Sequence, residues 1–149
     1  MKKILVAIVV VLIAIQFIPV DLSNPARVPE DDFFYINEAP AEVKSLVRSA
    51  CYDCHSNETV YPSYAQFAPI NFWLKHHVDE GREELNFSNW ARYVMMNKAN
   101  HKLDECAELV QNKKMPLKSY SWMHDGAQLT DAQRAILVKY FSDLMKKQN

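Results

Sequence analysis

The sequence predicts an all-α fold on the strength of three observations. Gly81 and Gly126 are the only glycines among the 149 residues, too few for the close turns of a many-stranded sheet. Apolar residues recur at helical spacing in several segments, and no segment shows a convincing strand pattern. The length fits one compact domain with a short N-terminal appendage. The formal charge of −1 gives no indication of nucleic-acid binding.

The N-terminus combines two lysines with an apolar run. Lys2 and Lys3 precede apolar residues from 4 to 18, interrupted once by Gln16 and ended by Pro19. This pattern is typical of an export segment, so residues 1–20 are expected to form a signal peptide or a membrane anchor. The absence of a small-x-small cleavage site favours an uncleaved anchor, and the flanking lysines disfavour a buried core helix. We therefore expect inner-membrane anchoring with the domain facing the periplasm, the alternative being a cleaved, soluble periplasmic form.

Behind this segment the chain divides into a tether and a domain. Residues 21–39 are rich in Pro, Asp and Asn, which predicts an extended tether, and the apolar stretch 33–36 is expected to dock it. Residues 40–149 are expected to form the domain. Within it, helical spacing of apolar residues and a capping box of Thr130 and Gln133 predict the helices. They are expected at residues 40–50, 71–84, 88–97, 103–112 and from 131 onward.

The strongest chemical signal is the pentapeptide Cys51-Tyr52-Asp53-Cys54-His55, which has the form C-x-x-C-H. Two thiols at this spacing each form a thioether with one vinyl group of a haem, and the adjacent histidine then reaches the iron as the proximal ligand. The motif predicts one covalent haem c, held by Cys51 and Cys54 and ligated by His55.

Other uses of the two cysteines are less compatible with the sequence. A thioredoxin-like redox pair belongs in a βαβ context that this helical pattern lacks. A zinc site needs further ligands, and His101 and Cys106 are not suitably spaced. A disulfide between Cys51 and Cys54 would close a tight loop and stabilise little.

The sixth iron ligand decides between electron transfer and small-molecule chemistry. Met115 is the main candidate, because it precedes Pro116 in an irregular stretch between two predicted helices. The alternatives are that Met115 fills the core, or that a histidine ligates instead. His77, near Trp73 on the helix expected at 71–84, is the first of these, followed by His76, His101 and His124.

Several aromatic and polar residues are candidates for contacts with the porphyrin. Trp73, Trp90 and Tyr64 have the flat apolar surfaces that would wall a haem, although each is also an ordinary core residue type. The haem propionates need donors, and Arg82, Tyr64 or Trp90 would serve.

Taken together, these motifs resemble the bacterial haem-binding domain family, small exported proteins that are similar to c-type cytochromes and carry one C-x-x-C-H. The resemblance implies haem binding on a cytochrome-c-like helical fold, without naming a reaction. Ser63 departs from it, because many members carry Trp there, which puts one haem contact in doubt. The matching residues are 51–57, Tyr61-Pro62, Ala68-Pro69, 77–90, Met115-Pro116, Tyr120 and His124.

The function expected from these features is electron transfer by a membrane-tethered, single-haem cytochrome that exchanges electrons with exported redox partners, and not enzyme catalysis. One alternative is a haem peroxidase or gas sensor with an open or displaceable sixth position, in which His76, His77 or Arg82 acts as a distal acid or base. A further alternative is an accessory module in which the haem is chiefly structural.

Overall fold

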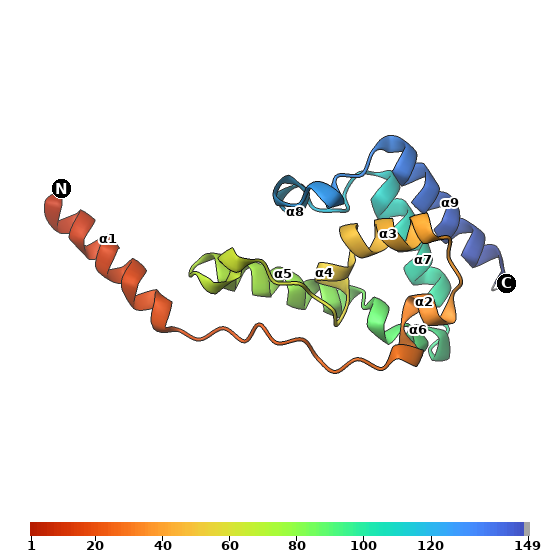
Figure 1. The fold of residues 1–149 in the computed structure, drawn as a ribbon, viewed down its shortest axis with the longest axis horizontal. Coiled ribbons are helices and arrows are strands. Elements are labelled where there is room, and N and C mark those ends of the chain that lie inside the picture. Colours follow the sequence, from red (N-terminus) through yellow and green to blue (C-terminus); the bar gives the residue numbers. More distant parts are fainter. Residues whose placement is uncertain (148–149) are drawn as a thin grey trace.

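The computed structural model describes residues 1–147, and every regular element in this part of the chain is a helix (Figure 1). The all-α prediction is confirmed. The domain was predicted to end at 149, and its last two residues lie outside the described part.

Helix α1 (Lys2–Ala14) stands apart from the domain at one end of the molecule and continues as a 3-10 turn, Ile15–Phe17 (Figure 1). Its apolar side chains are all exposed. A signal-anchor helix is not confirmed, because none of the helices in residues 1–147 is long and apolar enough to cross a membrane.

The segment after α1 runs along the domain before it enters the core. Residues 18–28 have no regular structure, and hydrogen bonds from Asn24 Nδ2 to the Thr59 carbonyl and from Asn57 Nδ2 to the Ala26 carbonyl, both 2.9 Å, hold them. A 3-10 turn (Pro29–Asp31) and helix α2 (Phe33–Ile36) follow. Phe33 is fully buried, so a residue of the predicted tether forms part of the domain core.

The core forms where α3 (Ala41–Ala50), α6 (Trp90–Met95), α7 (Ala99–Gln111) and α9 (Asp131–Lys147) meet. Helices α7 and α9 lie side by side, and α3 packs against α9 (Figure 1). Their buried residues recur at three- and four-residue intervals, such as Leu103 and Cys106 on α7, because that spacing puts them on one helix face. The capping box starts α9: the Gln133 amide donates to Thr130 Oγ1 (3.2 Å), and the Thr130 amide donates to Gln133 Oε1 (2.8 Å).

A second group of elements extends from the core toward α1 (Figure 1). It comprises α4 (Tyr52–His55), the 3-10 turn Ser63–Gln66, α5 (Ile70–Glu84), α8 (Lys118–Met123) and the 3-10 turn Asp125–Ala127. The 3-10 turn Phe87–Asn89 joins α5 to α6 and buries Phe87 in the core. Gly81 explains how closely α5 approaches α4. A Cβ atom at this position would lie 2.7 Å from the Cys54 carbonyl oxygen, well inside contact distance.

Candidate functional site

Three adjoining cavities form one groove over α4, between α5 on one side and α7, α8 and their connecting loop on the other. Their volumes are about 340, 590 and 560 Å³, each in the range of sites that hold organic cofactors. The first and second share His55 and Met115, and the second and third share His77 and Tyr120. The C-x-x-C-H motif therefore lies in the floor of a continuous groove.

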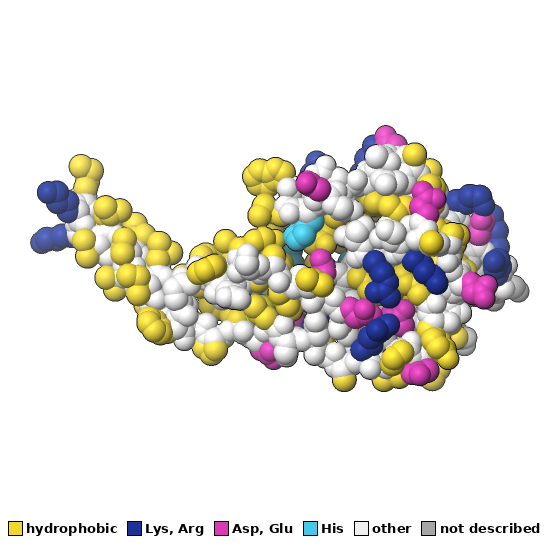
Figure 2. Space-filling view, viewed as in Figure 1, with side chains coloured by type: hydrophobic (Ala, Val, Ile, Leu, Met, Phe, Trp, Pro, Cys, Tyr) yellow, Lys and Arg dark blue, Asp and Glu magenta, His cyan; other side chains and the backbone are white. Residues whose placement is uncertain are grey.

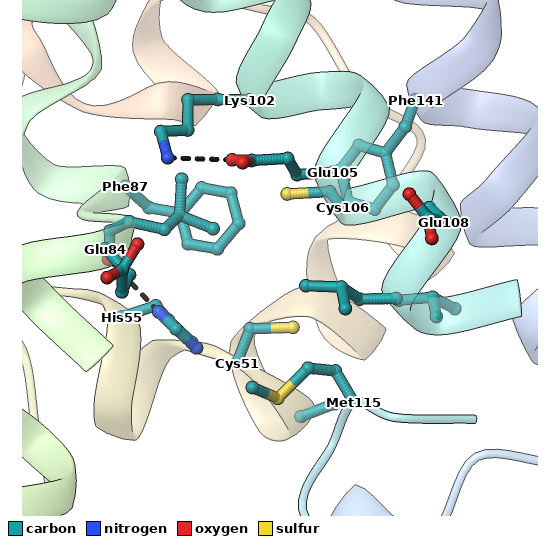
Figure 3. Close-up of a pocket in the computed structure, with 14 residues that line it drawn as sticks. Cys51, His55, Glu84, Phe87, Lys102, Glu105, Cys106, Glu108, Met115 and Phe141 are labelled. Atoms are coloured by element: carbon teal, nitrogen blue, oxygen red, sulfur yellow. Dashed lines mark hydrogen bonds and ion pairs between the residues drawn. The ribbon is translucent and has the colours of Figure 1, made fainter. Parts of the chain in front are cut away.

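His55, the last residue of α4, is held in one orientation by the end of α5. Its Nδ1 lies 2.7 Å from the Gly81 carbonyl oxygen and 3.1 Å from that of Leu85. Carbonyls only accept hydrogen bonds, so Nδ1 carries the proton and Nε2 keeps a free lone pair. Burial lowers the pKa of His55, which favours the neutral ring. The imidazole projects into the first cavity (Figure 3), as a metal ligand requires.

Cys51 and Cys54 flank His55 from the two ends of the groove. Cys51 lines the first cavity, whereas Cys54 lines the second and third. Both thiols are free, and burial raises the pKa of Cys51 to about 12 and that of Cys54 to about 11. Each is therefore a protonated thiol at neutral pH in this fold, and each sulfur can form one thioether with a vinyl group of a haem.

Met115 lies in the loop between α7 and α8 and lines both cavities that His55 lines (Figure 3). The loop is fastened at its backbone. The Met115 amide donates to the Leu109 carbonyl (3.1 Å), and Arg134 Nη1 on α9 donates to the carbonyls of Met115 (2.6 Å) and Val110 (3.0 Å). The thioether is thus presented to the groove from a fixed loop. The sequence reasoning missed Arg134, because no motif marks a side chain whose acceptors are backbone carbonyls.

His77, Tyr64 and Trp73 also line the groove. His77 faces the second and third cavities, and the other two face the third, where the Trp73 and His77 rings lie 4.4 Å apart. Within the described residues, His77 Nδ1 is buried without a hydrogen-bond partner. His77 is one turn before Gly81 on α5, so it shares the helix face that holds His55. Met115, on the loop between α7 and α8, lines both cavities that His55 lines, whereas His77 lines only one of them.

Two residues expected to contact the haem lie elsewhere. Arg82 donates to the Ser56 carbonyl (2.8 Å), Thr59 Oγ1 (2.7 Å) and Asn24 Oδ1 (2.5 Å), because it leaves α5 away from the groove. Trp90 is fully buried in the aromatic core, 4.6 Å from the Phe33 ring centroid. Neither lines one of the three cavities, so their predicted contact with the porphyrin gains no support from the groove.

Tyr120 on α8 fastens the third cavity to the motif. Its hydroxyl lies 2.7 Å from Asp53 Oδ2 and 3.2 Å from the Ser49 carbonyl oxygen. Burial, followed by the contact with Asp53, raises the pKa of Tyr120, so the hydroxyl stays a neutral donor. This contact was not predicted, since Asp53 occupies a position of the C-x-x-C-H motif that the motif leaves unspecified.

The two ends of the groove differ in charge. Among residues 1–147, none of those lining the third cavity is Asp, Glu, Lys or Arg, and we call this the apolar end. The first and second cavities form the acidic end, where Lys102 pairs with Glu105 at 2.7 Å. The acidic residues lining this end are Glu80, Glu83, Glu84, Glu105 and Glu108.

The helical fold, the oriented imidazole and the two thiols in one groove define a protein that holds a haem. The chain belongs to the haem-binding domain family, whose model matches residues 10–143. This match confirms the family predicted from the sequence. No curated protein and no solved structure gives a match.

Proposed function

We propose that this protein is a membrane-tethered, single-haem cytochrome of the c type that carries electrons in the periplasm. The observation that carries the proposal is that the oriented His55 imidazole and Met115, on a loop fastened at its backbone, line the same two cavities beside the two motif thiols. When bound, a c-type haem supplies an iron that accepts and releases one electron, and His/Met ligation raises its potential. Cys51 and Cys54 would hold that group covalently, and His55 and Met115 would be the axial ligands.

The chain's own residues have three tasks in this function. The carbonyls of Gly81 and Leu85 keep the proton on His55 Nδ1, which leaves the lone pair of Nε2 available to a metal. Arg134 holds the Met115 loop, and a fixed ligand keeps the site in one geometry in both oxidation states. The apolar side chains of the first cavity, such as Phe87 and Phe141, exclude water from the centre of the groove.

A haem enzyme would need an open sixth position with an acid or base beside it, and the residues expected in that role are placed differently. His76 is exposed and pairs with Glu80 at 3.3 Å. Arg82 is bonded to Ser56 and Thr59, and His77 shares the α5 face that holds His55. These positions favour the carrier over the peroxidase or sensor.

The N-terminus supports export and membrane attachment. Lys2 and Lys3 precede the apolar side chains of α1, all of which are exposed. A helix that is apolar on every face requires an apolar environment, and lysines at its start are typical of the cytoplasmic side of an inner membrane. Because α1 alone is too short to cross that membrane, in this proposal the 3-10 turn Ile15–Phe17 and residues 18–20 extend it, and the haem domain faces the periplasm and its redox partners.

The test is spectroscopy of protein produced with a c-type haem maturation system. Wild type should retain haem on a denaturing gel and be low-spin when oxidised, with a far-red sulfur-to-iron charge-transfer band. Met115→Ala should lose that band and bind CO when reduced, whereas Met95→Ala, at an exposed position on α6, should change neither. Loss of low-spin character in His77→Ala but not in Met115→Ala would reassign the ligand. A high-spin wild type that binds CO rapidly would favour the enzyme or sensor.

A further inference from the structure

A set of large apolar side chains is exposed around the apolar end of the groove. Four of them line the third cavity together: Ile70 and Trp73 on α5, and Trp122 and Met123 on α8. Trp122 is 82% exposed and Trp73 is 48% exposed. Single exposed apolar residues are ordinary, but a contiguous group marks a surface that contacts something apolar. We call these four residues, with Phe67 of the neighbouring loop, the apolar tip.

The apolar tip is joined to the end of helix α1. Gln16 and Ala68 form two hydrogen bonds of 3.0 Å, from the side-chain amide to the Ala68 carbonyl and from the Ala68 amide to Gln16 Oε1. Phe17 and Ile18, which follow Gln16, are exposed beside this junction. Hydrophobic side chains therefore continue from α1 onto the adjoining end of the domain, as Figure 2 shows.

The chemistry of α1 identifies what covers this surface. Beyond Lys2 and Lys3 the helix is apolar on every side, and a groove on a protein partner would cover only one side of it. A lipid bilayer surrounds such a helix completely. Tryptophan is also the residue enriched where a bilayer meets water, because its ring is apolar and its N–H is polar. Most of the charged side chains on the face in Figure 2 lie at the end of the domain far from α1.

We propose that the apolar tip rests in the interface of the lipid bilayer, with Trp73 and Trp122 among the headgroups. This surface rests on the proposed membrane tether and deepens it, since it fixes how the domain stands on the membrane. The apolar end of the groove then faces lipid, and the acidic end faces water and the redox partner.

The test uses the three tryptophans of the full-length haem protein, labelled with 5-fluorotryptophan and inserted into phosphatidylcholine–phosphatidylglycerol nanodiscs. Trp73→Phe and Trp122→Phe assign two of the three fluorine resonances. The third belongs to Trp90, which is 0% exposed and serves as the internal control. In the reduced protein, lipids with a nitroxide near the headgroup should broaden the Trp73 and Trp122 resonances several-fold more than that of Trp90.

Four other outcomes would overturn the proposal in different ways. If all three resonances stay equally sharp with the nitroxide lipid in protein that co-elutes with the discs, the apolar tip does not contact the bilayer, but the membrane tether is still supported. Broadening of the Trp73 and Trp122 resonances by a water-soluble gadolinium chelate, and not by the lipid nitroxide, places the apolar tip in solvent. Protection from both reagents indicates a second copy or a partner protein. Failure to co-elute with the discs at all counts against the membrane tether itself.

Discussion

The acidic end of the groove and its apolar end adjoin over α4 but differ in their rims. Cys54 lines both ends, Cys51 and His55 line only the acidic end, and α5 contributes a wall to each. At the acidic end, glutamates of α5 and α7 surround the opening, whereas the rim of the apolar end carries Trp73 and Trp122. In the proposed cytochrome, the motif residues between the two ends would hold the haem, and the rims would determine what approaches it.

The largest effect on stability and haem content is expected from Gly81→Ala, at the place where α5 packs against α4. The new Cβ would meet the Cys54 carbonyl at 2.7 Å, so α5 must move away from α4 and carry the acceptors of His55 with it. Overpacking of this kind lowers the free energy of unfolding by about 1–3 kcal/mol. Haem content per chain and chemical denaturation would measure it. Gly126→Ala is the control, because its Cβ would lie 3.8 Å from the nearest atom. Equal behaviour of the two variants would refute the close-packing role of Gly81.

A more local effect, limited to the Met115 loop at the acidic end of the groove, is expected from Arg134→Gln. The carbonyls of Val110 and Met115 lose a charged donor, which lowers the free energy of unfolding by about 2 kcal/mol and releases the Met115 loop. The far-red band should weaken, and CO should bind more readily to the reduced protein. Arg92→Gln, at an exposed position on α6, is the control. An unchanged band in a destabilised Arg134→Gln protein would limit Arg134 to a structural role.

The smallest effect is expected from the rim charges. Glu83→Gln combined with Glu108→Gln removes two exposed carboxylates from the acidic end, so oxidation of the reduced protein by the anion ferricyanide should become a few-fold faster at low salt. The gain should vanish at high salt, because exposed charges are screened. Stopped-flow kinetics would measure both. Glu30→Gln with Asp31→Asn removes the same charge from the turn before α2 and is the matched control. Equal rates in the two variants would show that the acidic end does not steer its partner.

Local signals predicted the helices well. The spacing of Val43, Leu46 and Val47 sets the buried face of α3, and the Thr130–Gln133 box marks where α9 begins, because both depend on residues within two turns. The motif was recognisable because two thiols and an imidazole have a chemistry that few other arrangements share. Helix α8 was not predicted, since it has six residues without a side-chain cap and depends on the distant contact between Tyr120 and Asp53.

The walls of the groove could be predicted only in part. Periodicity shows that a residue faces inward but not what it faces, so Trp73 and Trp90 were equivalent in the sequence, although one lines the groove and the other fills the core. Arg82 looked like a propionate donor because its hydrogen-bond partners, the Ser56 carbonyl among them, have no signature in the sequence. The role of Arg134 could not be predicted for the same reason, because its acceptors are backbone carbonyls, which every residue has.

The fastening of residues 18–28 has a consequence for how the molecule works. A segment of this length without such contacts would be a flexible linker, and the domain could take many positions relative to its anchor. Asn24 instead forms hydrogen bonds with Arg82 and Thr59, and Asn57 donates to the Ala26 carbonyl, so the segment is fastened to the domain like a bracket. In a membrane-tethered protein such a bracket sets the height and tilt of the haem. A redox partner of the proposed cytochrome would then have to reach a docking point at a fixed height above the membrane.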